Sequence, residues 1–106
     1  MIRQYTGETV KIEVVVLDEE NPLVPPDLSS AVAKFACINL ETNVTIEKDA
    51  VITDNVVTAR LESDETLVPG RYKCEIRILV DGDVDSIFYE NMILKEAIMT
   101  TIEEDV

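Results

Sequence analysis

Histidine and tryptophan are missing from this chain of 106 residues, and glycine and aromatic residues are scarce. Without histidine there is no imidazole that could act as a general base, complete a Ser-His-Asp triad or bind zinc in the commonest ligand sets. The three glycines do not form a phosphate-binding loop. The sequence therefore offers no recognisable catalytic set, and we expect a protein that is not an enzyme and has no cofactor and no metal ion.

Basic residues are also few. Nine Lys and Arg stand against 22 Asp and Glu, which gives a net charge of −13. Such a charge repels the phosphates of nucleic acids and the surface of anionic membranes, so we expect no nucleic acid and no membrane among the partners. An acidic surface suits docking onto a basic patch of another protein.

Long apolar runs are absent too. No run approaches the roughly 20 residues that span a membrane. Residues 1–5 lack the apolar core and small-residue cleavage site of a signal peptide. We therefore expect the chain to be cytosolic at synthesis.

Cys37 and Cys74 are the two cysteines, and both lie in segments of alternating apolar residues. In a reducing compartment we expect buried thiols. The alternative, if their strands are neighbours, is a disulfide bond between them, although two cysteines are too few for a disulfide scaffold.

The clearest feature present is the alternating segment that follows the turn signal Pro69-Gly70. Strand side chains change face at every residue. One face then carries Tyr72, Cys74, Ile76, Ile78 and Val80. This pattern predicts a half-buried strand at the centre of a sheet, ended by a two-residue hairpin at Asp81-Gly82.

Shorter alternating segments predict the other strands. They lie at residues 2–5, 10–17, 32–38, 44–47 and 56–62, and a return strand begins near residue 84. Residues 48–50 look like a break, residues 51–53 are ambiguous, and residues 27–30 allow a single helical turn. About seven short strands separated by turn signals predict an all-β fold, an immunoglobulin-like antiparallel β-sandwich. We expect one domain over residues 1–99 and an acidic, frayed tail over residues 100–106.

The spacing Gly70-x-Tyr72-x-Cys74 matches the tyrosine corner of immunoglobulin-like domains, in which a tyrosine stands two residues before a cysteine. The alternative is a strand whose inward positions happen to be Tyr and Cys. Because tryptophan is absent, the full signature of antibody domains is not met.

The last strand carries apolar residues on both faces. They are Ile87, Phe88, Tyr89, Met92, Ile93 and Leu94. Either this strand is buried on both sides, or these residues form a partner surface or a self-association edge. A bulge at Glu90-Asn91 would explain the change of face. A short helix beginning near Glu90 is the alternative, and we favour the strand.

The alternating aspartates of Asp81-Gly82-Asp83-Val84-Asp85 could offer oxygen ligands to calcium. The segment lacks the sixth-position glycine and the distal glutamate of a calcium-binding loop. We interpret it as a solvated hairpin tip.

Three ordered motifs carry a family resemblance. They are Gly7-Glu8-Thr9 before an alternating strand, Asp27-Leu28-Ser29-Ser30 before the next, and Pro69-Gly70-Arg71-Tyr72 before the central one. Together they resemble immunoglobulin-like modules of tailed-phage and prophage structural proteins. The nearest likeness, over residues 7–94, is to the N-terminal domain of baseplate upper proteins. Ser30 stands where the family commonly has glycine.

This resemblance implies a structural or assembly protein of the phage tail or baseplate, assembled in the bacterial cytoplasm and located in the virion. Its partners would be other phage structural proteins and copies of itself. One alternative is an immunoglobulin-like adhesion or carbohydrate-binding module of the bacterial surface, which would require export. Another is a hydrolase that relies on its carboxylates.

Overall fold

The computed structural model describes residues 1–17 and 27–97 of the chain. In this part the alternating segments form seven strands: β1 (Ile2–Tyr5), β2 (Val10–Val15), β3 (Val32–Asn39), β4 (Thr45–Thr53), β5 (Val56–Leu61), β6 (Gly70–Val80) and β7 (Asp83–Lys95). A single 3-10 turn, η1 (Ser63–Glu65), precedes β6. No helix in the described ranges is long and apolar enough to cross a membrane. The expected tail lies outside these ranges.

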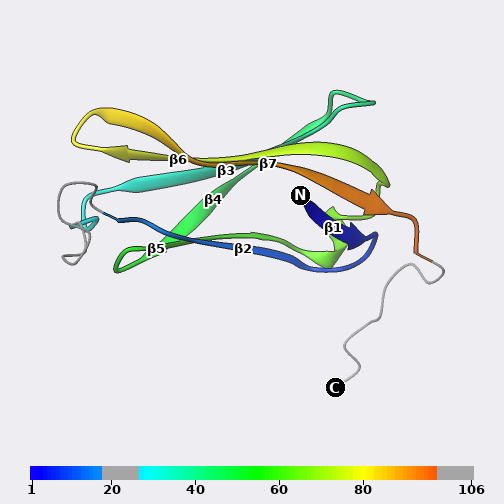
Figure 1. Ribbon diagram of the computed structural model, residues 1–106, viewed down its shortest axis with the longest axis horizontal. Coiled ribbons are helices and arrows are strands. Elements are labelled where there is room, and N and C mark those ends of the chain that lie inside the picture. The colour runs from blue at the N-terminus through cyan, green and yellow to red at the C-terminus, as the bar shows by residue number, and fades with distance from the viewer. Residues whose placement is uncertain (18–26, 98–106) are drawn as a thin grey trace, which may run out of the picture.

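All seven strands belong to one sheet, in the order β1-β7-β6-β3-β4-β5-β2 (Figure 1). The sheet folds back on itself and is nearly closed into a barrel. In Figure 1, β7, β6 and β3 lie on one side, β5 and β2 on the other, and β4 runs diagonally between them. The all-β prediction is confirmed. The purely antiparallel arrangement is wrong at one place, because β1 runs parallel to β7.

β4 is longer than the sequence predicted. The expected break at residues 48–50 does not exist, because this strand continues from Thr45 to Thr53. Its first part pairs with β3, ending at Ala33 opposite Ala50, and its last three residues pair with β5. One strand thus supplies hydrogen bonds to both sides of the fold, so the two sides form one continuous sheet.

The core lies between the two sides. The inward face of β6 provides four of its members, and the rest come from the facing strands. The buried apolar residues are Val10, Ile12, Leu28, Ala33, Phe35, Cys37, Val57, Ala59, Leu61, Tyr72, Cys74, Ile76, Ile78, Met92 and Leu94. Burial of each large apolar side chain contributes about 1.5–3 kcal/mol, so residues from both sides of the fold stabilise it.

The predicted hairpin after β6 is confirmed. Asp81 and Gly82 both have positive φ, at 50° and 85°, as a two-residue turn of this hand requires. β7 then runs as one strand to Lys95, so the alternative of a helix beginning near Glu90 is wrong for the described residues. The change of face does come from a register shift, but it lies at Ile87, between the pairs Ile76–Phe88 and Arg77–Ser86, and not at Glu90-Asn91.

The tyrosine corner is present. The Tyr72 hydroxyl donates a hydrogen bond of 2.8 Å to the carbonyl oxygen of Val68, four residues upstream. The ring itself is buried at the start of β6, two residues before Cys74. The bond fixes the path of the chain as it enters the central strand.

We expect Tyr72→Phe to keep the buried ring but to lose this hydrogen bond, which lowers the free energy of unfolding by about 1 kcal/mol. Urea denaturation followed by circular dichroism measures the change. Tyr5→Phe is the matched control, since the Tyr5 ring is half exposed. Equal stability of both variants would contradict a stabilising corner.

Candidate functional site

β7 carries the six apolar residues that the sequence singled out, and it lies near one edge of the sheet. β6 pairs with it along its length, whereas β1 pairs only with its last part, from Met92 to Lys95. Among the described residues, no strand pairs with the outer edge of residues 83–91. This free edge of β7 (residues 83–91) presents backbone N–H and C=O groups that another strand could bind.

Two of the six residues are core residues. Met92 and Leu94 are buried where β1 covers β7, at 1% and 3% exposure, and they lie beside Ile2 and Gln4. Neither side chain can contribute to an outer surface. The last part of β7 is therefore anchored in the core, whereas its first part is exposed.

The other four residues divide between the two faces of β7. Ile87 and Phe88 are partly buried and pack against the margin of the core. Tyr89 is exposed on the outer face, where the ammonium group of Lys73 lies 5.9 Å from its ring centre. Ile93 is partly buried on the same side as Tyr89. The six residues therefore do not form one surface.

Three carboxylates on the free edge lie on the inward face of the sheet. Asp83, Asp85 and Glu90 each pair with a β6 residue whose side chain faces the core, as Asp85 does with the buried Ile78. Directly paired residues share a face of the sheet. All three side chains are exposed, and none of the described strands pairs with this part of β7. The terminal amino group of Met1 lies 3.4 Å from Oε2 of Glu90.

The inward position of Asp83 and Asp85 does not follow from the apolar pattern of β7 alone. Counting back from Met92 places Phe88 and Ser86 inward, whereas counting on from the hairpin places Asp83 and Asp85 inward. The bulge at Ile87 resolves this conflict of parity. The sequence contains the signal for this bulge. The Asp81-Gly82 turn predicts one set of inward residues, and the apolar residues near Met92 predict the other.

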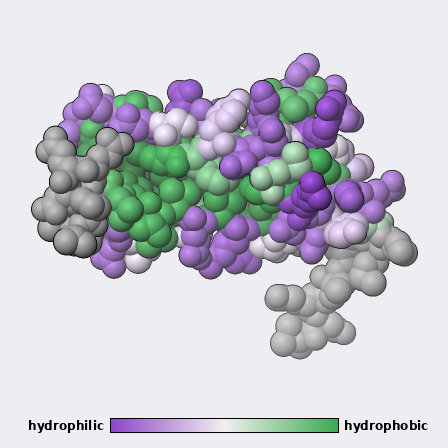
Figure 2. Space-filling model, viewed as in Figure 1, coloured by the Kyte–Doolittle hydropathy of each residue, from purple (hydrophilic) through white to green (hydrophobic). Residues whose placement is uncertain are grey.

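An apolar strip lies beside the free edge. The gap that keeps the barrel open separates the edge formed by β1 and β7 from the edge formed by β2. Figure 2 shows apolar side chains between the two sides of the fold, in the half of the molecule that β1 does not reach. Val14 of the terminal strand β2, Val16 just after it, and Ile87 and Phe88 of β7 are among the partly buried side chains that pack against the core.

The two cysteines form a directly paired cross-strand couple. Cys37 of β3 lies opposite Cys74 of β6, with 2.9 Å between the sulfur atoms, and both are fully buried free thiols. The prediction of buried thiols is therefore confirmed. The hydrogen bond between the sulfurs and the burial of both raise the pKa of Cys37, so it remains a thiol at neutral pH.

A hollow of about 970 Å³ lies near the start of β3 and the end of β4 and is lined in part by Asp27, Lys34 and Asp49. Lys34 donates a hydrogen bond to Asp49, which raises the pKa of the lysine. The backbone N–H of Ser29 donates to Asp27 and lowers the pKa of that carboxyl. Both shifts move away from neutral pH, so these groups are poorly suited to proton transfer.

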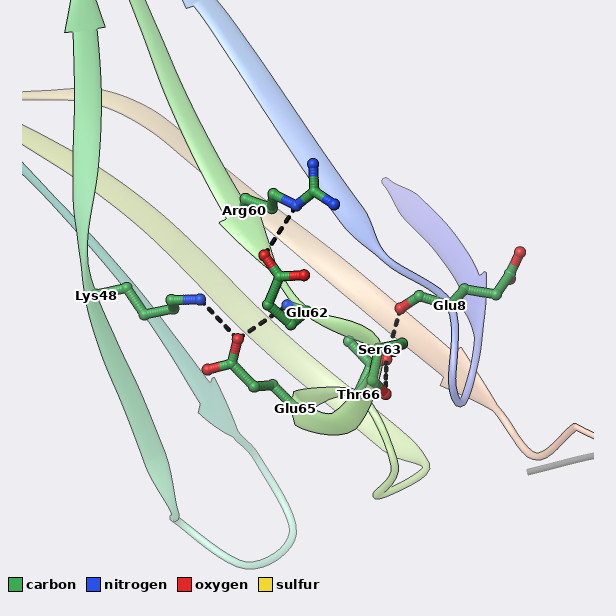
Figure 3. A network of polar contacts seen from close by, with 7 residues as sticks. All are labelled: Glu8, Lys48, Arg60, Glu62, Ser63, Glu65 and Thr66. Carbon is green, nitrogen blue, oxygen red and sulfur yellow. Dashed lines mark hydrogen bonds and ion pairs between the residues drawn. The ribbon is translucent and has the colours of Figure 1, made fainter. Parts of the chain in front are cut away.

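A polar network at the other end holds η1 in place (Figure 3). Lys48 of β4 and the backbone N–H of Glu62 both donate to Oε1 of Glu65, at 2.6 and 2.9 Å. The buried hydroxyl of Thr66 donates to the carbonyl of Glu8, at 2.6 Å. The bond from Lys48 is the main reason why the pKa of Glu65 lies below its ordinary value of 4.5. These contacts join β4, the η1 turn and the loop before β2, so we assign them a structural role.

No protein-family model matches this chain, and no curated protein sequence is similar enough to count as a relative.

Because both thiols are buried, we expect an aromatic disulfide reagent to modify the native protein at least about a hundredfold more slowly than the urea-unfolded chain. The release of the coloured thiolate measures both rates. The unfolded chain serves as its own control and should show both thiols. Rapid modification of the native protein would contradict the burial of the pair.

We expect ionised Glu65 to stabilise the fold, because its pKa is lower in the folded protein than in the unfolded chain. This contribution is present above the ordinary pKa and is lost as the pH falls through the lowered folded value. Glu65→Gln should therefore cost about 0.5–1 kcal/mol at pH 7, and progressively less as the pH is lowered through the folded pKa of Glu65, as urea denaturation measures. Asp64→Asn, at an exposed neighbour, should show a smaller dependence. A cost for Glu65→Gln that does not change with pH would contradict the ion pair.

Proposed function

We propose that this chain is a non-enzymatic structural module of a phage or prophage particle, associated with the tail or baseplate, which assembles through protein–protein contacts along its sheet edges. The observation that carries this proposal is the free edge of β7. Its open backbone groups and the apolar strip beside it suit the addition of a strand from another protein.

The strand order supports an immunoglobulin-like module as the scaffold. In that fold the third, sixth and seventh strands are neighbours in one layer, and the second, fifth and fourth are neighbours in the other. Here β3, β6 and β7 are adjacent, as are β2, β5 and β4. The tyrosine corner at Tyr72 lies at the matching place. The pairing of β1 with β7 and the double pairing of β4 are departures from the constant-domain arrangement.

The distribution of polar groups supports a surface role over a catalytic one. The sequence has no histidine, and Asp27 and Lys34, which line the hollow near the start of β3, have pKa values shifted away from neutral pH. No cluster of three or more potential metal-ligating residues occurs in the described ranges. We therefore base the proposed role on the shape and charge of the sheet edges.

This function predicts that particles purified from the induced host contain the chain in a constant ratio to the other structural proteins. Quantitative mass spectrometry of gradient fractions measures the ratio. An abundant cytosolic enzyme of the host is the control and should fall to background. If the chain is depleted with that enzyme, the proposal is wrong. Labelling of the chain on the surface of intact, uninduced cells would favour the adhesion module instead.

A further inference from the structure

The free edge of β7 also indicates what kind of segment would bind there. We propose that it receives an extended segment of a different, basic protein, which lies in line with β1 and places on its inward face Lys or Arg side chains beside the carboxylates of the edge and an apolar side chain beside Phe88. This inference rests on the proposed function, because it names the chemistry of the partner at the contact that the function requires.

The backbone of the free edge can pair with an added strand. β1 occupies the outer side of β7 only as far as Met92, where it pairs through Ile2. Residues 83–91 continue the same strand in the same sheet, with β6 still paired on the other side. A segment placed in line with β1 would therefore continue an existing pairing and would satisfy the free N–H and C=O groups of this edge.

The apolar strip beside the free edge can contact an apolar side chain of the added segment. Ile87 and Phe88 are partly buried at the margin of the core, and Val14 lies at the opposite margin. An apolar side chain of the added segment would cover this strip in the way that Ile2 covers the core beside Met92. The apolar area removed from water would favour binding and offset part of the cost of ordering the segment.

The negative charge of the free edge favours a basic segment. Asp83, Asp85 and Glu90 point to the inward face of the free edge, and a positive charge already lies there, since the Met1 amino group is 3.4 Å from Glu90. Lys or Arg side chains at the neighbouring positions of an added segment would pair with these carboxylates. Acidic segments would be repelled.

The same charges argue against a second copy as the occupant. Pairing two free edges would bring the inward carboxylates of both copies together, on molecules that each carry a net charge of −13. Inward-pointing charges on an edge strand are a known means of preventing edge-to-edge association. The charges on this edge therefore disfavour pairing with a second copy of the chain and favour binding of a basic partner.

The test uses the full chain, labelled with ¹⁵N, and a blocked synthetic peptide about as long as residues 83–91. One face of the peptide carries lysine at the positions beside Asp83, Asp85 and Glu90 and valine at the position beside Phe88. The other face carries threonine. We expect amide shifts and increased protection from hydrogen exchange in residues 83–91. Replacing the lysines with glutamate should abolish binding. A peptide of unchanged charge with a central proline should bind at least about tenfold more weakly, because proline cannot pair along a strand.

Two protein variants complete the test. Asp85→Lys with Glu90→Lys should weaken binding of the lysine peptide at least about tenfold. The matched control, Glu47→Lys with Asp64→Lys, makes the same change of net charge at exposed sites away from β7 and should alter binding less than about twofold. Far-ultraviolet circular dichroism verifies that both variants fold.

Several outcomes would overturn the inference. They are no shifts at the highest soluble peptide concentration, shifts centred elsewhere, equal binding of the proline peptide, or equal weakening by the control variant. Concentration-dependent dimerisation of the protein alone, with shifts in residues 83–91, would assign the edge to a second copy. None of these results changes the composition of purified particles, so failure here can be told apart from failure of the proposed function.

Discussion

The hydrogen bonding of β4 to two different strands is the constraint on which the rest of the fold depends. Its first part pairs with β3 and its last part with β5, so it closes one side of the structure. The barrel can then be open only between the remaining terminal strands. There β1 pairs with just the last part of β7, and the free edge of β7 follows from that mismatch in length.

The free edge combines features that a closed core would not tolerate. Asp83, Asp85 and Glu90 lie on the inward face, where burial of an unpaired carboxylate would be costly. They remain exposed because no described strand covers them. Where β1 does cover β7, the inward residues are Met92 and Leu94. The change from apolar to acidic residues along one face thus follows the end of β1.

Much of the fold was accessible from local patterns. The alternation around Tyr72 and Cys74, the Asp81-Gly82 hairpin and the all-β class all depend on side-chain period and turn chemistry, which neighbouring residues determine. The continuity of β4 was not accessible in this way. Lys48 and Asp49 look like a break, yet strand pairing with β3 keeps them extended. The parallel pairing of β1 likewise joins residues at opposite ends of the chain.

The candidate site shows the same division. The sequence by itself determined that β7 carries apolar residues on both faces, that aspartates follow the turn, and that no histidine chemistry is available, because composition and order are local properties. Only the tertiary structure decided which of those residues are core and which are free. Burial depends on how far β1 extends along β7, and that length is set by contacts between segments about ninety residues apart.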